Sequence, residues 1–125
     1  MKTYKEVYQL PLEDQHGWIY DQKGNFVFQF LIDNEEMEKK LLDVINGKKN
    51  LTNLDLVFKH EKGLIVDKKG YEVILIRGWG NLTGKGALNL PEKEAANIQD
   101  TFANFIVERL NYRDGGFKTL MQQGQ

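Results

Sequence analysis

Two stretches of this chain share one pattern of apolar and polar positions. Residues 18–30 and 64–76 each contain an apolar run, an Asp-x-Lys-Gly turn and a second apolar run. The aspartate can accept hydrogen bonds from the turn backbone, and the glycine can adopt a positive φ, so each stretch predicts a β-hairpin. Because this turn chemistry recurs in unrelated proteins, we attribute the similarity to the turns rather than to an internal duplication.

A helical pattern follows the first hairpin. Its apolar stripe consists of Met37, Leu41, Val44 and Ile45. We expect Asp33 to be the N-cap, with Glu36 completing a capping box and Ile32 packing on Met37 as a hydrophobic staple. Asn46 and Gly47 are residue types that end helices. The acidic residues outside the stripe, among them Glu35 and Glu38, are interpreted as helix-capping or solvated residues.

The central part of the chain predicts three further strands. Residues 54–59 form the first, and a turn at 61–63 joins it to the second hairpin. Residues 73–76 are apolar on both faces, which is typical of a strand in the middle of a sheet with both sides covered. Residues 4–10 alternate weakly and predict an edge strand.

A second, longer helix begins near residue 91. Its central stripe consists of Ala95, Ile98, Phe102, Phe105 and Ile106. We expect Asn89 to cap it, Pro91 to occupy its first turn and Glu92 to complete a capping box. The apolar arc is wider than one sheet face demands, so the helix is a candidate surface for a homodimer.

The elements together predict an α+β domain of residues 1–112, followed by a flexible polar tail at 113–125. The sheet is antiparallel with five strands, or six if residues 4–10 contribute one, and two helices pack on it. The order is β-β-α-β-β-β-α. The expected core includes Phe28, Phe30, Leu41, Val73, Leu75, Ile98, Phe102 and Phe105. Over residues 17–111 this order resembles the profilin-like longin and roadblock modules, a resemblance of topology that implies a protein-binding platform.

Composition excludes several classes of protein. The 125 residues carry 17 basic and 18 acidic side chains, so no global field attracts nucleic acid or anionic lipid. Without cysteine there are no disulfides or thiolate ligands. The N-terminal segment is not apolar, and no run approaches the length of a membrane span, so we expect a cytoplasmic protein with no membrane partner. Charge is uneven, since residues 12–47 hold eight acids and three lysines, whereas residues 48–70 hold six lysines and three acids.

The glycine-dense loop at residues 77–86 is the candidate contact surface. Its four glycines fit neither the P-loop nor the dinucleotide-binding spacing, and the helix that follows begins with acidic residues that would repel phosphate. The candidate binding residues are Arg77, Gly78, Trp79, Gly80, Asn81, Thr83 and Lys85. Trp79 has two interpretations, a lid over the core formed with Leu82 and Leu88, or an exposed anchor for a partner.

No arrangement of residues predicts catalysis. His16 and His60 lie in polar turns without a recognisable partner, the spacing of metal ligands is missing, and the sequence contains no serine. We therefore expect no catalytic residue, no metal and no cofactor.

The function expected from the sequence is that of a non-enzymatic module that binds another protein. Residues 77–90 resemble small uncharacterised proteins of bacteriophages and other bacterial mobile elements, which implies a partner in a bacterial host. Two alternatives remain open. The same loop could bind single-stranded nucleic acid or a nucleotide, or the chain could form a structural homo-oligomer. For nucleic acid the possible stacking platforms are Tyr4, Tyr8, Trp18, Tyr20, Trp79 and Tyr112, although core packing explains most of these aromatics.

Overall fold

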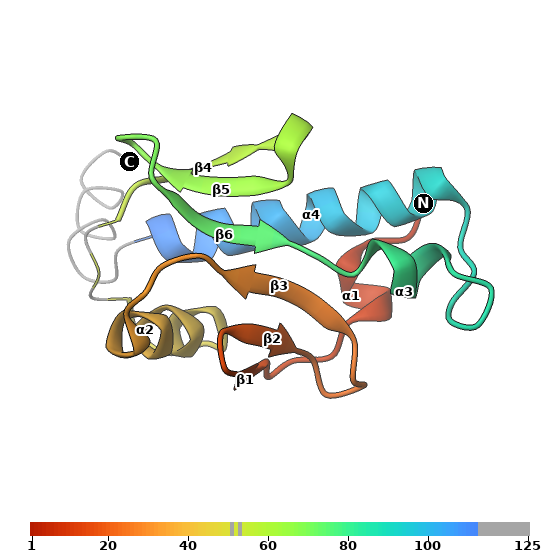
Figure 1. The fold of residues 1–125 in the computed structure, drawn as a ribbon, viewed down its shortest axis with the longest axis horizontal. Coiled ribbons are helices and arrows are strands. Elements are labelled where there is room, and N and C mark those ends of the chain that lie inside the picture. The colour runs from red at the N-terminus through yellow and green to blue at the C-terminus, as the bar shows by residue number, and fades with distance from the viewer. Residues whose placement is uncertain (51, 53, 113–125) are drawn as a thin grey trace, which may run out of the picture.

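The computed structural model describes residues 1–50, 52 and 54–112, so the predicted tail at 113–125 lies outside it. The protein has the predicted α+β fold, with one antiparallel sheet of six strands in the order β1-β2-β3-β6-β5-β4 (Figure 1). The strands are β1 (Glu13–Gln15), β2 (Trp18–Tyr20), β3 (Phe26–Phe30), β4 (Leu56–Lys59), β5 (Leu64–Asp67) and β6 (Glu72–Ile76). The helices are α1 (Tyr4–Val7), α2 (Glu35–Ile45), α3 (Trp79–Thr83) and α4 (Glu92–Asn111), with a 3₁₀ turn η1 (His60–Lys62). None of the described helices is long and apolar enough to cross a membrane.

Both predicted hairpins form through the predicted chemistry. The Oδ1 atoms of Asp21 and Asp67 each accept hydrogen bonds from the backbone N–H groups two and four residues later, at 2.8–3.0 Å. Gly24 and Gly70 have φ values of 85° and 90°. The turns that the sequence predicts therefore connect β2 to β3 and β5 to β6.

The prediction of an edge strand at residues 4–10 is wrong. Residues 4–7 form the short helix α1, and the sixth strand is β1, which a turn at His16 and Gly17 joins to β2. The reason lies in α4, against which two tyrosines pack. Tyr4 stacks on Phe105 with ring centroids 4.9 Å apart, and Tyr8 meets Phe102 edge-on at 4.9 Å.

The wide apolar arc of α4 is covered within the chain. Ile98, Phe102 and Ile106 are fully buried in the core, and α1 covers the neighbouring part of the arc. The Thr101 hydroxyl on α4 accepts a hydrogen bond from the Tyr4 backbone N–H at 3.2 Å. The arc therefore no longer supports a homodimer.

Both predicted helix caps differ from the structure. The N-cap of α2 is Asn34, whose Oδ1 accepts a hydrogen bond from the Met37 N–H at 3.0 Å, so neither the Asp33 capping box nor the staple is in register. Asn89 does not cap α4. It has a φ of 50°, and its N–H donates to the carbonyl of Gly84, because residues 84–90 fold back on α3 before α4 begins.

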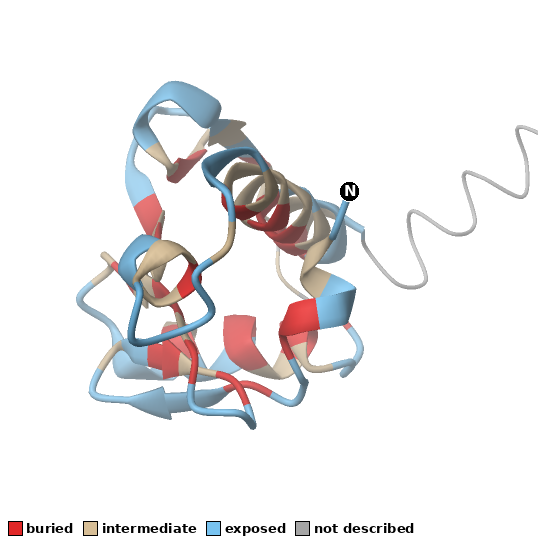
Figure 2. Ribbon diagram, turned by 90° about the vertical axis from the view of Figure 1, so that its right-hand side faces the viewer, coloured by how far each residue is buried: buried red, intermediate tan, exposed pale blue. Residues whose placement is uncertain are grey.

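One face of the sheet carries the core, and the other is not covered by any described helix. Figure 2 shows α4 on one side of the sheet, and Figure 1 looks onto the opposite side. The central position of β6 is confirmed. All the predicted core residues are buried except Phe105 and Leu75, which are partly exposed. Leu75 pairs with Gln29 and Leu64 on the uncovered face, so within the described residues no second layer covers the sheet as residues 73–76 predict.

Candidate functional site

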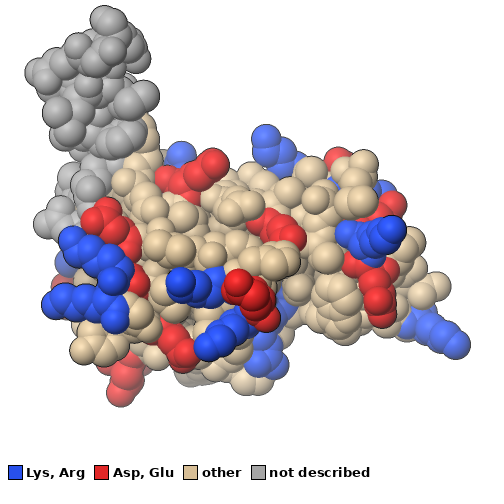
Figure 3. Space-filling model, turned by 90° about the horizontal axis from the view of Figure 1, so that it is seen from above, with Lys and Arg blue, Asp and Glu red and all other residues tan. Residues whose placement is uncertain are grey.

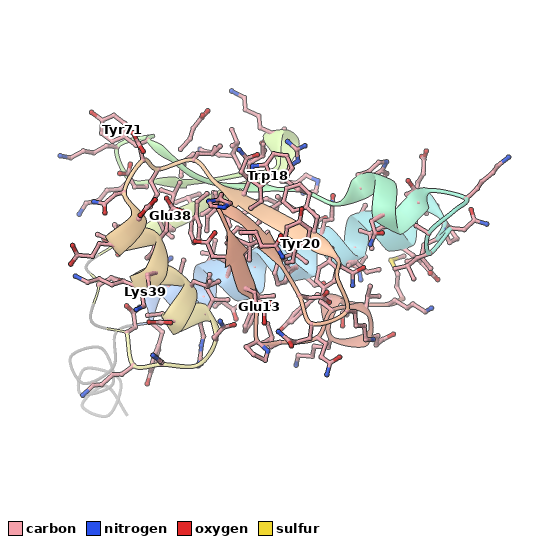
Figure 4. All side chains as sticks on the ribbon, turned by 60° about the horizontal axis from the view of Figure 1, so that its bottom comes forward. Glu13, Trp18, Tyr20, Glu38, Lys39 and Tyr71 are labelled. Carbon is pink, nitrogen blue, oxygen red and sulfur yellow. The ribbon has the colours of Figure 1, made fainter. Side chains whose placement is uncertain are left out.

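An aromatic cluster lies on the uncovered face of the sheet. The Trp18 ring stacks on Phe26 with centroids 5.1 Å apart and an angle of 9° between the planes, and Tyr20 stacks on the same ring at 5.3 Å. Figure 4 shows Trp18 and Tyr20 side by side on β2. Trp18 is 46% exposed. Large aromatics that are stacked on one another and open to solvent are rigid contact groups.

A β-bulge places Phe26 in this cluster. Strict alternation along β3 would direct Phe26 to the core with Phe28 and Phe30. Ile19 pairs with Phe28 but the next residue of β2 pairs with Phe26, so β3 contains one extra residue between these pairs. The extra residue changes the side to which Phe26 points.

The glycine-rich segment at residues 77–86 adjoins the cluster, and the prediction that all of it is a loop is wrong, because residues 79–83 form the helix α3. The Arg77 guanidinium lies over the Phe26 ring, 5.4 Å from its centroid. A shallow pocket of ≈ 560 Å³ is lined by Phe26, Arg77 and Trp79 together with Lys62 and Gln99. Trp79 is 42% exposed. We call Trp18, Tyr20, Phe26, Arg77 and Trp79 the aromatic face.

A buried polar network holds the loop in place. Asp21 and Asn25 are 4% and 8% exposed, and the Asn25 amide donates to Asp21 at 2.9 Å. The Asn81 amide of α3 donates to the Asn25 side-chain oxygen, and the Gln9 backbone N–H donates to Asp21 at 2.8 Å. Because buried polar groups are costly when unpaired, this network ties α3 to the β2–β3 turn and to the N-terminal segment.

Gly78 is required by the backbone, whereas Gly80 is not. Gly78 has a φ of 96°, and a β-carbon at this position would overlap with the carbonyl oxygen of Phe26. No atom lies within 4 Å of the position that a β-carbon on Gly80 would take. Gly78 is therefore needed for the tight turn that leads from β6 into α3, and not to make the whole segment flexible.

The predicted site residues have two kinds of role. Arg77, Trp79, Gly80 and Lys85 are exposed. The other three hold the loop together: Gly78 forms the turn, Asn81 joins the polar network, and the Thr83 hydroxyl donates to the Trp79 carbonyl at 2.9 Å. Trp18, Tyr20 and Phe26 are absent from the predicted site, because their strand positions point to core packing and the bulge has no signal in the sequence.

The role of a lid over the core, which is one of the two interpretations of Trp79, belongs to another residue. Leu82 is fully buried beneath the loop and performs the lid role, whereas Leu88 is 46% exposed. Trp79 itself is half exposed and lines the shallow pocket. Its indole is therefore open to a partner molecule on one side.

Some charged groups outside this site form ion pairs with one another. In the basic segment 48–70, Lys48 lies 3.5 Å from Asp43 and Lys68 lies 3.6 Å from Asp55. Figure 3 shows acidic and basic side chains interleaved on the face that carries β4 and β5. The expectation that His60 has no partner is wrong, because its Nδ1 lies 3.0 Å from Asp100 Oδ1. Within the described residues, no group of three or more His, Asp or Glu side chains is arranged to hold a metal ion.

Comparisons with protein-family models, with curated proteins and with solved structures find no match for this chain. The resemblances to longin-like modules and to proteins of mobile elements therefore stay predictions.

Proposed function

We propose that this protein is a non-enzymatic module that binds another protein through the aromatic face. The observation that supports the proposal is the grouping around Phe26 of the Arg77 guanidinium and of Trp18 and Trp79, both close to half exposed. Trp, Tyr and Arg are the residues that most often dominate the binding energy of protein interfaces. Stacking and the bulged strand fix their orientation before a partner arrives, which lowers the entropy that binding must overcome.

The chemistry of the face indicates the chemistry of the partner. An apolar side chain of the partner would enter the pocket between Phe26 and Trp79, and a carboxylate would pair with Arg77, which offers a planar, bidentate set of donors. The resemblance of residues 77–90 to phage and mobile-element proteins favours a bacterial host protein, such as a defence or regulatory protein.

The test is affinity capture from bacterial lysate, followed by measurement with the purified partner. The chain and its Trp18→Ala and Arg77→Ala variants are immobilised in parallel. We expect each variant to lose the captured protein and to weaken the purified complex by at least about 2 kcal/mol, or roughly 30-fold in Kd.

Val57→Ala is the matched control, because Val57 is 48% exposed on the edge strand β4, away from the aromatic face. It should bind like the wild type. Thermal melting of each variant separates lost contacts from lost folding. A partner that binds Trp18→Ala and Arg77→Ala normally but fails to bind Val57→Ala would contradict the proposal.

Binding of single-stranded nucleic acid is the second candidate, favoured by the stack of Trp18 and Tyr20 on Phe26 beside an arginine. Bases stack on such aromatics without regard to sequence. The test is the quenching of tryptophan fluorescence by oligo-dT and oligo-rU of twelve nucleotides, measured in 20 mM and in 200 mM NaCl. Salt-dependent quenching that disappears in Trp18→Ala would support this candidate, and no quenching at 20 mM NaCl would exclude it.

A further inference from the structure

A second, acidic pocket lies between α2 and the β1–β2 turn, separate from the aromatic face. It has a volume of ≈ 940 Å³ and contains the carboxylates of Asp14, Asp33, Glu35 and Glu38. Lys39 and His16 are the other titratable residues in its wall. Phe30, Ile32 and Leu42 supply an apolar part of the same wall. Acidic groups therefore outnumber the basic ones around an opening with an apolar side.

Glu38 is the unusual member of this pocket. Of its two expected roles, helix capping or solvation, solvation is wrong, whereas the nearby backbone N–H of the N-cap residue Asn34 agrees with capping. It is 8% exposed and lies where α2 meets the hairpin (Figure 4). A β-carbon on Gly17 would lie 3.5 Å from its Oε1 atom, so the carboxylate points toward the turn. Among the described side chains none donates a hydrogen bond to this carboxylate or forms an ion pair with it. The backbone N–H of Asn34 is the one nearby group that favours its charged form.

The surroundings of Glu38 disfavour its negative charge. Burial is the main cause that raises its pKa, and the nearby carboxylates of Asp14, Glu35 and Asp33 add to the effect. Burial of a carboxylate without a paired cation costs free energy. In proteins that bury an ion pair, removal of one partner is strongly destabilising for the same reason. A cation placed in the pocket would relieve both the desolvation and the repulsion.

The lining of the acidic pocket suits an organic cation better than a metal ion. We propose that the acidic pocket binds an ammonium or guanidinium group carried on an aliphatic chain, with Glu38 as its direct counter-ion. The described carboxylates are not gathered closely enough to form a metal site. A single charged head with a carbon chain instead needs one close carboxylate, neighbouring negative charge, and an apolar wall such as that of Phe30, Ile32 and Leu42.

Two sources supply this chemistry, a lysine or arginine side chain of a peptide and a free polyamine. Titrations followed by ¹⁵N–¹H NMR at pH 7.5 and 20 mM NaCl would use three probes, the peptides Ac-Gly-Arg-Gly-NH₂ and Ac-Gly-Lys-Gly-NH₂ and the diamine cadaverine. We expect saturable shifts of the amides of residues 14–17 and 35–39. The stronger of the peptide and diamine responses identifies the source. The neutral citrulline and acetyl-lysine peptides should produce no saturable shift.

The decisive variant is Glu38→Gln, which removes the charge with little change of shape. It should weaken binding at least tenfold. Glu36→Gln is the matched control on the same helix, because the Glu36 side chain is 83% exposed and pairs with Lys40, and it should change binding less than twofold. Glu35→Gln, at the rim, should have an intermediate effect. Equal responses to charged and neutral peptides, or unchanged binding in a folded Glu38→Gln variant, would overturn the proposal.

Discussion

Replacement of Gly78 by alanine should unfold this protein at a much lower temperature than the wild type. The native φ of 96° is a left-handed conformation, which costs an alanine about 1–2 kcal/mol. The added β-carbon would also overlap with the carbonyl oxygen of Phe26. That oxygen belongs to the backbone of β3 and has no rotamer by which to move away, so a further cost of about 1–3 kcal/mol is expected from displaced backbone.

Gly80→Ala is the matched control, two residues away in the same loop. Its β-carbon would have no neighbour within 4 Å, and the residue lies in α3. Alanine favours a helix over glycine by about 0.8–1 kcal/mol. The two substitutions add the same methyl group, yet we expect opposite effects on stability.

Thermal melting followed by circular dichroism measures the difference. For a chain of this length, 1 kcal/mol corresponds to a shift in Tm of roughly 4 °C. The combined cost of about 2–5 kcal/mol predicts a fall of roughly 8–20 °C for Gly78→Ala, whereas Gly80→Ala should raise Tm by a few degrees. A Gly78→Ala variant that melts within 2 °C of the wild type, or a loss of stability of similar size in both variants, would refute the reasoning.

Three further predictions concern single side chains. Phe102→Ala should lose about 3–5 kcal/mol of unfolding free energy in urea titrations, because Phe102 is fully buried among Tyr4, Tyr8 and Phe28. Trp79→Ala should lose only about 1–2 kcal/mol in the same assay, since the indole is already 42% exposed; a loss as large as that of Phe102→Ala would show that Trp79 carries the core. Glu38→Gln should raise Tm at pH 7.5, because the raised pKa means that the folded protein favours the protonated carboxyl. That gain should be complete above the folded pKa of Glu38 and should vanish as the pH falls below the ordinary value of 4.5, whereas an equal gain at pH 7.5 and pH 4 would contradict the assignment.

Short-range patterns determined most of the fold. Each hairpin depends on an aspartate that accepts two hydrogen bonds within its own turn, so the turn forms from five consecutive residues. The stripes of α2 and α4 follow the helical period and bury the predicted residues Leu41, Ile98 and Phe102. The central position of β6 follows from four consecutive apolar residues that suit the middle of a sheet.

The candidate site was predicted in part. The segment at residues 77–86 stands out in the sequence by its glycines and Trp79, and the structure shows Arg77 and Trp79 exposed there, although the sequence leaves open whether Trp79 is a lid or an exposed anchor. Their neighbours Trp18 and Phe26 lie more than 50 positions earlier in the chain. Strand alternation assigns Phe26 to the core, and only the pairing of β2 with β3 introduces the bulge that turns it outward.

The sequence by itself determined the turns, the helical stripes and the order of the main elements, because those depend on residues within a few positions of one another. The tertiary structure decided three features that depend on distant partners. Residues 4–7 became a helix because Tyr4 and Tyr8 pack on α4. The uncovered face acquired its aromatic cluster through one extra residue in β3. Glu38, which is polar and outside the stripe of α2, is buried because the β1–β2 turn lies against it, and no local pattern encodes the approach of that turn.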